Sequence, residues 1–242
     1  MKILAIDTTA KTAAAAITDG ERLLASATLN NPGTHSVTVL PTVETLLRGA
    51  SLTFSDIDMF AVSAGPGSFT GVRIGVSLVK GLAFGTDKPC VGVSSLEALA
   101  RNLTAVNGLI CPVMDARRNQ LYNALFTCEN GTITRLTEDR LITADELGEE
   151  LRGYAESRPV YFVGDGYGIA VSMIDCPNIL PTPEPLRWQN GYSVAMAALE
   201  KYSSALSSPD EIAQFTASSL SPVYLRASQA ERELKERQKR GQ

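Results

Sequence analysis

The chain has 242 residues, with 22 Lys and Arg against 26 Asp and Glu, a formal net charge of -4 and a single histidine. A chain of this length forms one large domain or two small ones and can bury a substantial core without disulfides. The net negative charge argues against a protein whose whole surface is built for nucleic acid. One histidine excludes any multi-histidine metal site and leaves a single imidazole for acid–base chemistry.

Four cysteines are spread along the chain without any C-x-x-C pair: Cys90, Cys111, Cys128 and Cys176. This spacing excludes a zinc knuckle or a thioredoxin-type motif, and we expect buried free thiols in a reducing, cytoplasmic environment. Lys2, Asp7 and Lys11 interrupt the N-terminal segment, which therefore does not resemble a secretory signal. No apolar run reaches about 18 residues, so we expect no membrane span.

Short apolar runs bounded by turn residues predict strands in the first part of the chain. The expected strands cover residues 2–7, 12–18, 22–28, 59–63 and 90–93. Helical patterns are expected from about Thr34 to Leu47, from Thr70 to Phe84, and after a cap at Ser94 or Ser95. Pro41 lies in the first two turns of the first helix and predicts a kink or a late start.

The pattern restarts near residue 108. Residues 109–115 are again an apolar run that ends in Asp, and strands are expected at 121–128 and 132–136 around the Asn130-Gly131 turn. The order strand, Asp, strand, turn, strand thus occurs twice, although the two copies are not similar in sequence and coincidence is the alternative. The repeated order predicts an α/β protein with two lobes, each with a mixed sheet led by three antiparallel strands.

The expected division of the chain follows from this restart. We place the first lobe at residues 1–107, the second lobe at 108–226 and a C-terminal tail at 227–242. Further elements are expected at 144–151 (helix), 160–163 (strand) and 192–202 (helix). The segment that begins at Arg226 has six basic and three acidic residues, so it is a basic element on an otherwise acidic chain.

The glycine-rich stretch Gly65–Gly75 is the strongest local motif. Its glycines permit a close backbone approach, and a helix N-terminus offers free N–H groups to an anion. The spacing fits neither the dinucleotide fingerprint nor the Walker A loop. The pattern favours the other interpretation, a capped helix whose small residues Gly71, Gly75 and Ser77 allow another helix to pack closely.

Two aspartates at expected strand ends, Asp7 and Asp115, suggest a magnesium site between the lobes, as in sugar kinases and actin-like ATPases. In those proteins a glycine usually follows such an aspartate and lets phosphate approach the backbone. Here Thr8 and Ala116 follow instead, so the phosphate-binding part is incomplete. The alternative is that each aspartate only forms a turn at the end of its strand.

His35 lies in the first turn of the first expected helix, with no second histidine four residues away. A surface or interface position is therefore the favoured interpretation. No G-x-S-x-G motif surrounds any serine, so the sequence does not support a hydrolase triad.

Five stretches carry a resemblance to a known family. They are Ile3-Leu-Ala-Ile-Asp-Thr8, Gly65-Pro-Gly-Ser-Phe-Thr-Gly-Val-Arg-Ile-Gly75, Gly92-Val-Ser-Ser-Leu-Glu-Ala-Leu-Ala100, Asp115-Ala-Arg117 with Tyr122, and Pro222-Val-Tyr-Leu-Arg226. Together they resemble the TsaB (YeaZ) family of tRNA threonylcarbamoyladenosine biosynthesis proteins. The resemblance spans residues 3–226 and is weak between about 137 and 219.

The resemblance implies a two-lobed actin-like fold of the ASKHA, ribonuclease H-like superfamily. It implies a non-catalytic scaffold or activator of the complex that transfers a threonylcarbamoyl group to N6 of the adenosine beside the anticodon of tRNAs reading ANN codons. The catalytic subunit would be TsaD, bound as a heterodimer, with TsaE docking on the pair and a homodimer forming when TsaD is absent. Contact with tRNA would be only indirect, through the complex.

The same resemblance implies that this chain has no cofactor, no bound metal and no catalytic residue. The two metal-binding histidines of TsaD align with Ser95 and Leu99, neither of which can replace an imidazole. In the family, the first two helices bind the partner, and the small residues Gly71, Gly75 and Gly81 would permit close helix packing. The residues expected to bind the partner are His35, Leu40, Val43, Leu47, Phe69, Thr70, Gly71, Ile74, Gly75, Leu78 and Leu82.

A function of another class stays open at this point. The chain would then be an actin-like ATPase or small-molecule kinase that uses Asp7 and Asp115. A vestigial nucleotide site in a non-catalytic protein would draw on the same region, namely Asp7, Thr8, Thr9 and Asp115. Contact of the basic tail with tRNA or TsaE is also open, although a solvated terminal helix is the favoured interpretation.

Overall fold

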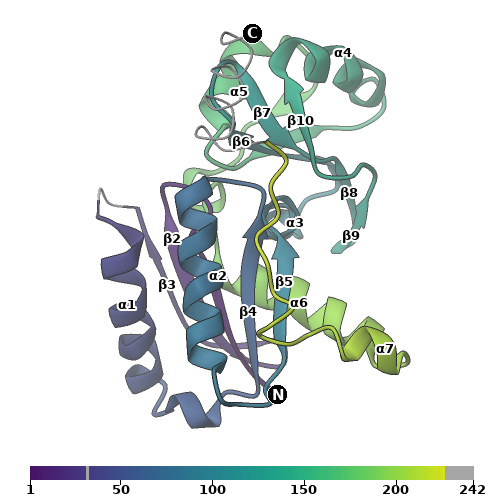
Figure 1. Cartoon of the computed structure of the whole chain (residues 1–242). Helices are drawn as coiled ribbons and strands as arrows, with labels where there is room; N and C mark the ends of the chain where they lie inside the picture. Colours follow the sequence, from purple (N-terminus) through teal and green to yellow (C-terminus); the bar gives the residue numbers. More distant parts are fainter. Residues whose placement is uncertain (31–32, 227–242) are drawn as a thin grey trace, which may run out of the picture.

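A computed structural model describes residues 1–30 and 33–226. They form a mixed α/β protein with two sheets, one above the other in the view of Figure 1. The expected basic tail at 227–242 lies outside the described residues. Among the helices of the described part, none is long and apolar enough to cross a membrane.

The first sheet has five strands in the order β3-β2-β1-β4-β5. Its strands are β1 (Lys2–Asp7), β2 (Ala13–Asp19), β3 (Arg22–Leu29), β4 (Met59–Gly65) and β5 (Cys90–Ser94). The first three are antiparallel, while β4 and β5 run parallel to β1. The sheet is therefore mixed and led by three antiparallel strands, as the sequence predicts.

Helices cover both faces of this sheet, which is why β1 is an almost unbroken apolar run. Leu4 and Ile6 face α1 (His35–Gly49) and α2 (Phe69–Ala83), while Ile3 faces α6 (Gly191–Ala205) on the other side. Alternate residues of a strand point to opposite faces, so one strand supplies two separate cores. Pro41 is accommodated inside α1, which begins at His35 with Thr34 as its cap.

The second sheet has seven strands, with β6 at its centre. Its strands are β6 (Gly108–Asp115), β7 (Gln120–Asn123), β8 (Phe126–Glu129), β9 (Thr132–Arg135), β10 (Arg140–Thr143), β11 (Val160–Val163) and β12 (Ile179–Leu180). One face packs on α4 (Ala144–Ala155) and α5 (Tyr167–Met173). The other face packs on α3 (Ser95–Ala100), which lies between the two sheets (Figure 1).

The expected single strand at 121–128 is wrong, because it is divided into β7 and β8. These two strands pair with different halves of β6, at Val113–Asp115 and Gly108–Ile110. Pro112 lies between those halves and has no N–H to donate to a neighbouring strand. The Asn123 side chain instead donates to the Pro112 carbonyl oxygen at 3.0 Å, where the chain changes partners.

The chain returns to the first sheet after completing the second. Helix α6 packs against β1, β2, β4 and β5, although the sequence analysis placed residues 108–226 together in the second lobe. An amphipathic pattern predicts that a helix is buried, but it does not identify the sheet that buries it. The short helix α7 (Pro209–Ile212) follows, and three 3₁₀ helices complete the fold at Phe54–Asp56, Arg101–Leu103 and Glu184–Leu186.

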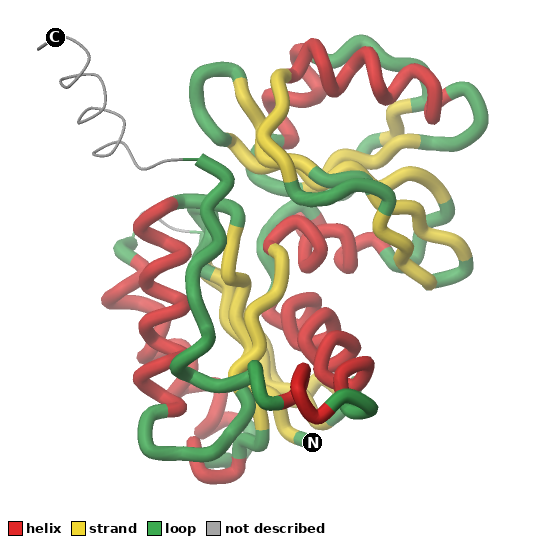
Figure 2. The backbone as a smooth tube through the Cα atoms, turned by 45° about the vertical axis from the view of Figure 1, so that its right-hand side comes forward, coloured by secondary structure: helices red, strands yellow, loops and turns green. Residues whose placement is uncertain are grey.

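Residues 220–226 form a segment without helix or strand that we name the C-terminal strap. It runs alongside the first sheet toward the second one, as the loop-coloured tube in Figure 2 shows. Leu220 belongs to the core of the first sheet. At the far end, Arg226 Nη1 donates to the carbonyl oxygen of Ala116, directly after β6, at 2.6 Å. The strap therefore contacts the first sheet at one end and the second sheet at the other.

Candidate functional site

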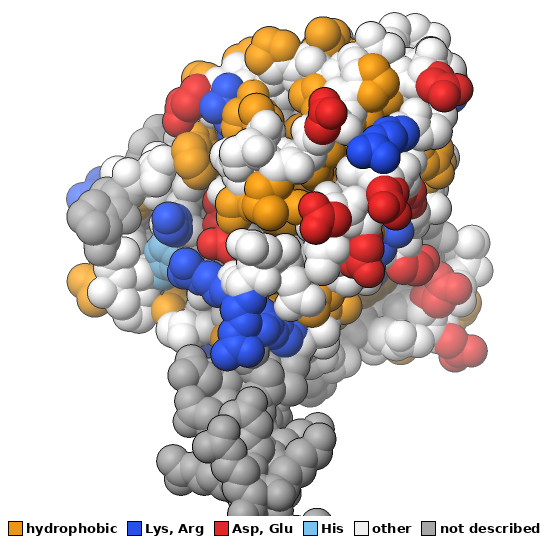
Figure 3. All heavy atoms as spheres, turned by 90° about the horizontal axis from the view of Figure 1, so that it is seen from above, with side chains coloured by type: hydrophobic (Ala, Val, Ile, Leu, Met, Phe, Trp, Pro, Cys, Tyr) orange, Lys and Arg blue, Asp and Glu red, His pale blue; other side chains and the backbone are white. Residues whose placement is uncertain are grey.

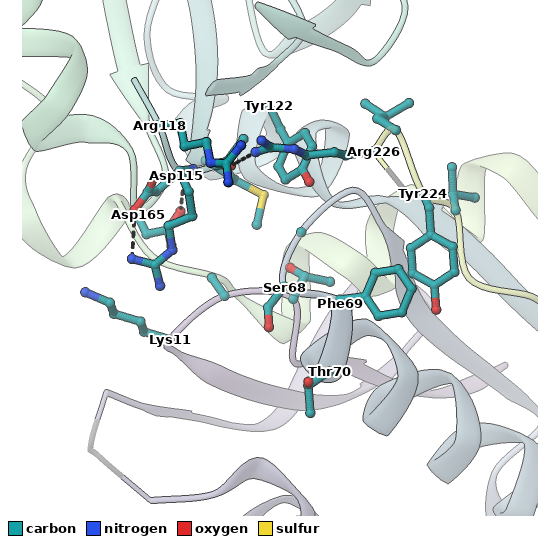
Figure 4. A pocket seen from close by; sticks show the side chains of 18 residues that line it. Lys11, Ser68, Phe69, Thr70, Asp115, Arg118, Tyr122, Asp165, Tyr224 and Arg226 are labelled. Carbon is teal, nitrogen blue, oxygen red and sulfur yellow. Dashed lines mark hydrogen bonds and ion pairs between the residues drawn. The ribbon is translucent and has the colours of Figure 1, made fainter. Parts of the chain in front are cut away.

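A cavity of about 600 Å³ lies between the two sheets (Figure 4). Its walls are the turn after β1, the start of α2, the β6–β7 hairpin, the loop after β11 and the strap. Residues from these five segments are Thr9–Lys11, Gly67–Thr70, Met114–Arg118, Asp165 and Val223–Arg226, together with Tyr122. Cavities of this size and shape suit small molecules.

Charged side chains line this cavity. The cationic ones are Lys11, Arg117, Arg118 and Arg226, and the acidic ones are Asp115 and Asp165. Lys and Arg side chains gather in one group on the face seen from above, near the histidine (Figure 3). Because the two carboxylates offset only part of this charge, the cavity is electropositive on a chain with a net charge of -4.

The hairpin that carries the two arginines has an unusual backbone. Arg117, Arg118 and Asn119 have φ angles of 66°, 57° and 58°, so three consecutive non-glycine residues are left-handed. Such residues cost free energy and persist only where surrounding contacts hold them. Asp115 supplies one such contact, because its Oδ1 accepts the Arg117 N–H at 2.7 Å.

Asp165 is the most perturbed acid of the cavity. Burial raises its pKa to about 6, while the backbone N–H of Asp115, 3.3 Å from Oδ1, opposes that shift. The sequence analysis did not identify Asp165, Lys11, Arg118 or Arg226 as site residues. The only signal for Asp165 is its place just after an expected strand, the same signal that identified Asp115.

The four residues of the expected nucleotide site do not lie together in the cavity. Thr9 and Asp115 line it. The Asp7 carboxylate is fully buried, where Oδ1 accepts from the Thr9 N–H and hydroxyl at 2.8 and 2.7 Å and Oδ2 accepts from Ser63 at 2.6 Å. Burial nevertheless raises the pKa of Asp7. Thr8 is also buried, and its hydroxyl donates to the Gly71 carbonyl oxygen at 2.7 Å.

Helices α1 and α2 lie side by side over one face of the first sheet (Figure 1). Several expected partner-binding residues point inward from them. Val43 and Leu47 are buried in the core. Gly71 and Gly75 are buried against the turn after β1, because a Cβ on Gly71 would meet the Thr8 carbonyl oxygen and one on Gly75 would lie 2.5 Å from Thr8 Oγ1. These four residues are therefore covered by the chain itself.

Other expected partner-binding residues reach the surface. Leu40 is 37% exposed and Thr70 is exposed, while His35, Phe69, Ile74, Leu78 and Leu82 are half-buried. His35 Nε2 donates to the Ala10 carbonyl oxygen at 2.7 Å. Along α2, the residues Thr70, Ile74, Ser77 and Gly81 follow one another at spacings of four, three and four, and we name them the outer stripe.

Three of the four residues of the outer stripe, Thr70, Ser77 and Gly81, are both small and exposed. A Cβ on Gly81 would meet no atom within 4 Å, in contrast to Gly71 and Gly75. Val37 of α1 is 70% exposed, and Phe84 directly after α2 is 87% exposed. The sequence analysis named Ser77 as a small residue for close helix packing but did not identify Val37 and Phe84 as surface residues, because burial on one helix face depends on the sheet beneath it.

Helix α3 holds Ser95 and Leu99, the two residues that the sequence analysis expected at the histidine positions of TsaD. Ser95 and Leu99 are both buried, in a helix whose Ser94 cap accepts the Glu97 N–H. Within residues 1–30 and 33–226, no group of three or more His, Cys, Asp or Glu side chains is placed to hold a metal ion.

Comparison with known proteins identifies relatives of this arrangement. The family model of TsaD, tRNA N6-adenosine threonylcarbamoyltransferase, matches residues 27–233. The tRNA threonylcarbamoyladenosine biosynthesis protein TsaB of Bacillus subtilis is 38% identical over 72% of this chain and 76% of its own length. The protein of the same name from Escherichia coli is 34% identical over 62% of this chain and 65% of its own length.

Solved structures agree with the sequence relatives. A Pseudomonas aeruginosa protein described as similar to peptidase YeaZ superposes with a TM-score of 0.76 at 26% identity, covering 93% of this chain and 99% of its own. A further structure, YeaZ from the same organism, has the same fold with a TM-score of 0.72. The α/β architecture with two mixed sheets that was expected from the sequence is thereby confirmed, and the chain belongs to the TsaB (YeaZ) family.

Proposed function

We propose that this chain is a non-catalytic subunit in tRNA threonylcarbamoyladenosine synthesis, which binds and activates the catalytic subunit TsaD. The assisted step is transfer of a threonylcarbamoyl group to N6 of the adenosine beside the anticodon of tRNAs reading ANN codons. Family membership supports this pathway, since the relatives carry its name. TsaE docks on the TsaD pair, and tRNA is reached only through that complex.

The outer stripe of α2 is the observation that carries this proposal. Its spacing of four, three and four residues is the spacing with which two helices pack along a shared seam. Thr70, Ser77 and Gly81 are small, so a partner helix can approach closely, while exposed Val37 and Phe84 supply apolar area beside them. When TsaD is absent, the same face pairs two copies of this chain.

The test fills the outer stripe without disturbing the fold. Gly81→Trp places a large side chain at a position where an added Cβ meets nothing within 4 Å beyond its own stretch of helix. We expect binding of TsaD, measured by co-elution and titration calorimetry, to weaken at least tenfold. Gly153→Trp is the matched control, because Gly153 is also a helical glycine with open space around its Cβ, on α4. Equal TsaD affinity of the two variants, with unchanged unfolding temperatures, would reject α2 as the docking surface.

The cavity is proposed as a vestigial nucleotide site without catalytic function. Thr9 and Asp115 line it, but the Asp7 carboxylate already accepts three hydrogen bonds from Thr9 and Ser63. Because these hydrogen bonds occupy the Asp7 carboxylate, they favour a structural role for Asp7 over metal binding. Metal-dependent ATP turnover by the isolated chain, abolished in Asp115→Asn, would instead establish the ATPase or small-molecule kinase.

A further inference from the structure

Beyond Leu220, which belongs to the core of the first sheet, the C-terminal strap is held at three further points. Its middle pairs with β4, because the Val223 N–H donates to the Ala64 carbonyl oxygen at 2.7 Å. The fit is tight, since a Cβ on Gly65 would meet the Val223 carbonyl oxygen. Beyond Val223, the strap leaves the first sheet and lines the cavity as far as Arg226.

The second point of attachment is a cluster of three side chains that we name the aromatic clamp: Phe69, Arg73 and Tyr224. The Phe69 and Tyr224 rings are stacked, with centroids 4.1 Å apart and planes 17° from parallel. Arg73 Nε donates to the Tyr224 hydroxyl at 2.8 Å, and its guanidinium lies 4.1 Å from the Phe69 ring centroid. The stacked pair is visible at the edge of the cavity in Figure 4.

The aromatic clamp places the strap next to the proposed docking surface. Phe69 and Arg73 occupy the first two turns of α2, each adjacent in sequence to a residue of the outer stripe, Thr70 or Ile74. A protein that packs on Thr70 and Ile74 therefore also meets the exposed edge of the clamp. Its contacts would favour the arrangement in which Tyr224 stays stacked on Phe69.

The third point of attachment lies across the cavity, on the β6–β7 hairpin. Arg226 donates to the Ala116 carbonyl oxygen at 2.6 Å, and the Ala116 N–H donates to the Gln120 carbonyl oxygen at 3.0 Å. The bond from Arg226 therefore holds the base of the turn that contains left-handed Arg117 and Arg118. The hairpin belongs to the second sheet, so the strap is a physical link between α2 and the opposite wall of the cavity.

We propose that the C-terminal strap couples docking on α2 to the ordering of the β6–β7 hairpin. Docking stabilises the aromatic clamp, the clamp holds the strap, and the strap holds the hairpin through Arg226. Coupling between two sites is reciprocal, so an ordered hairpin also favours docking. The coupling requires two states of the strap, one attached at Ala116 as in this structure and one released from it. This inference rests on the proposed function, because it takes TsaD as the docked protein.

Hydrogen exchange measured by mass spectrometry on the full chain, free and saturated with TsaD, tests the coupling. In the unmodified chain we expect docking to slow exchange at least fivefold both in α2 and in residues 115–121 of the hairpin. Arg226→Ala removes the bond to Ala116, so docking should still protect α2 while hairpin exchange changes less than twofold. Arg226→Lys keeps a donor at this position and should restore the protection of the hairpin.

The controls separate this inference from the proposed function. Arg158→Ala is the matched control, because Arg158 makes a long, 4.0 Å ion pair with Glu129 and lies outside the strap. It should behave like the unmodified chain. Protection of α2 without protection of the hairpin in the unmodified chain would overturn the coupling but keep the docking surface. Absence of protection in α2 at saturating TsaD would reject the docking surface itself. Hairpin protection that persists in Arg226→Ala would assign the coupling to another route.

Discussion

Asp7 is fully buried and Asp165 is half-buried, and the two carboxylates have different hydrogen-bond partners. Asp7 accepts three hydrogen bonds from Thr9 and Ser63, which partly offset the cost of burying its charge. Asp165 accepts a backbone N–H from Asp115 at 3.3 Å, and burial raises its pKa to about 6. A pKa above the unfolded value means that the ionised form is less stable in the folded chain than in the unfolded one.

Asp165→Asn should therefore stabilise the protein at neutral pH. The shift from 3.8 to about 6 corresponds to a gain of roughly 3 kcal/mol in the free energy of unfolding at pH 7.5. As the pH rises from about 4 to about 6, the unmodified chain loses stability relative to the Asp165→Asn variant. The gain in unfolding free energy from Asp165→Asn should therefore shrink as the pH falls through the same window. Urea unfolding at pH 7.5 and pH 4.5 measures both values.

Asp175→Asn provides the comparison for this measurement, because Asp175 is exposed. It should change the unfolding free energy little at either pH. A gain for Asp165→Asn that is the same at both pH values would show that the carboxylate charge is not responsible.

At the scale of one element, the glycines of α2 lie on two different sides of the helix. Gly75 faces inward, where a Cβ would lie 2.5 Å from Thr8 Oγ1 and 3.2 Å from the Val62 side chain. Gly81 faces outward into open space. The sequence analysis assigned both glycines, with Gly71, to the packing of a partner helix, because a glycine pattern does not distinguish a neighbouring strand from a neighbouring molecule.

The two positions should respond oppositely to the same substitution. Gly75→Ala forces the Thr8 region to move and should destabilise the chain by roughly 1–3 kcal/mol. Gly81→Ala adds a methyl group without a clash and should stabilise it by about 0.5–1 kcal/mol, through the higher helix propensity of alanine. Thermal and urea unfolding of both variants measure the change in the free energy of unfolding. A change of the same sign in both variants would contradict the orientation of α2.

Local patterns predicted most elements but not their long-range partners. The strand at 2–7, the helix that begins after Thr34 and the helix that ends near Phe84 follow from apolar spacing and capping residues, which act within a few residues. The division of the expected strand at 121–128 was missed, because it depends on Pro112 in a different strand. Likewise, Lys11, Asp165 and Arg226 come together only when the two sheets are stacked.

At the scale of the whole molecule, the first sheet depends on segments from both ends of the chain. Its face toward α6 contains Ile3, Ala5 and Val91, which pack on Val194 and Ala198 of that helix. The opposite face includes Leu220 of the strap in its core. A lobe defined as residues 1–107 therefore lacks part of its own hydrophobic covering.

A fragment ending at residue 107 should not fold cooperatively. Removal of α6 exposes one complete face of the sheet, and apolar burial is the main favourable term in folding. Joining residues 187–226 to this fragment through a short glycine and serine linker should restore a cooperative urea transition. A sharp transition in the fragment without this addition would show that the first lobe needs neither α6 nor the strap.

The order of synthesis gives the return of α6 to the first sheet a further consequence. Helix α6 ends at Ala205, about 110 residues after the end of β5 at Ser94. A ribosome adds roughly 5–20 residues per second, so this helix follows the strand after a delay of roughly 5–22 s. During that interval the second sheet can fold by itself, while the first sheet keeps one apolar face open. We therefore expect the middle of the chain, which forms the second sheet, to fold before the first sheet is complete. The apolar face of the first sheet that α6 later covers is the surface that chaperones would meet during this interval.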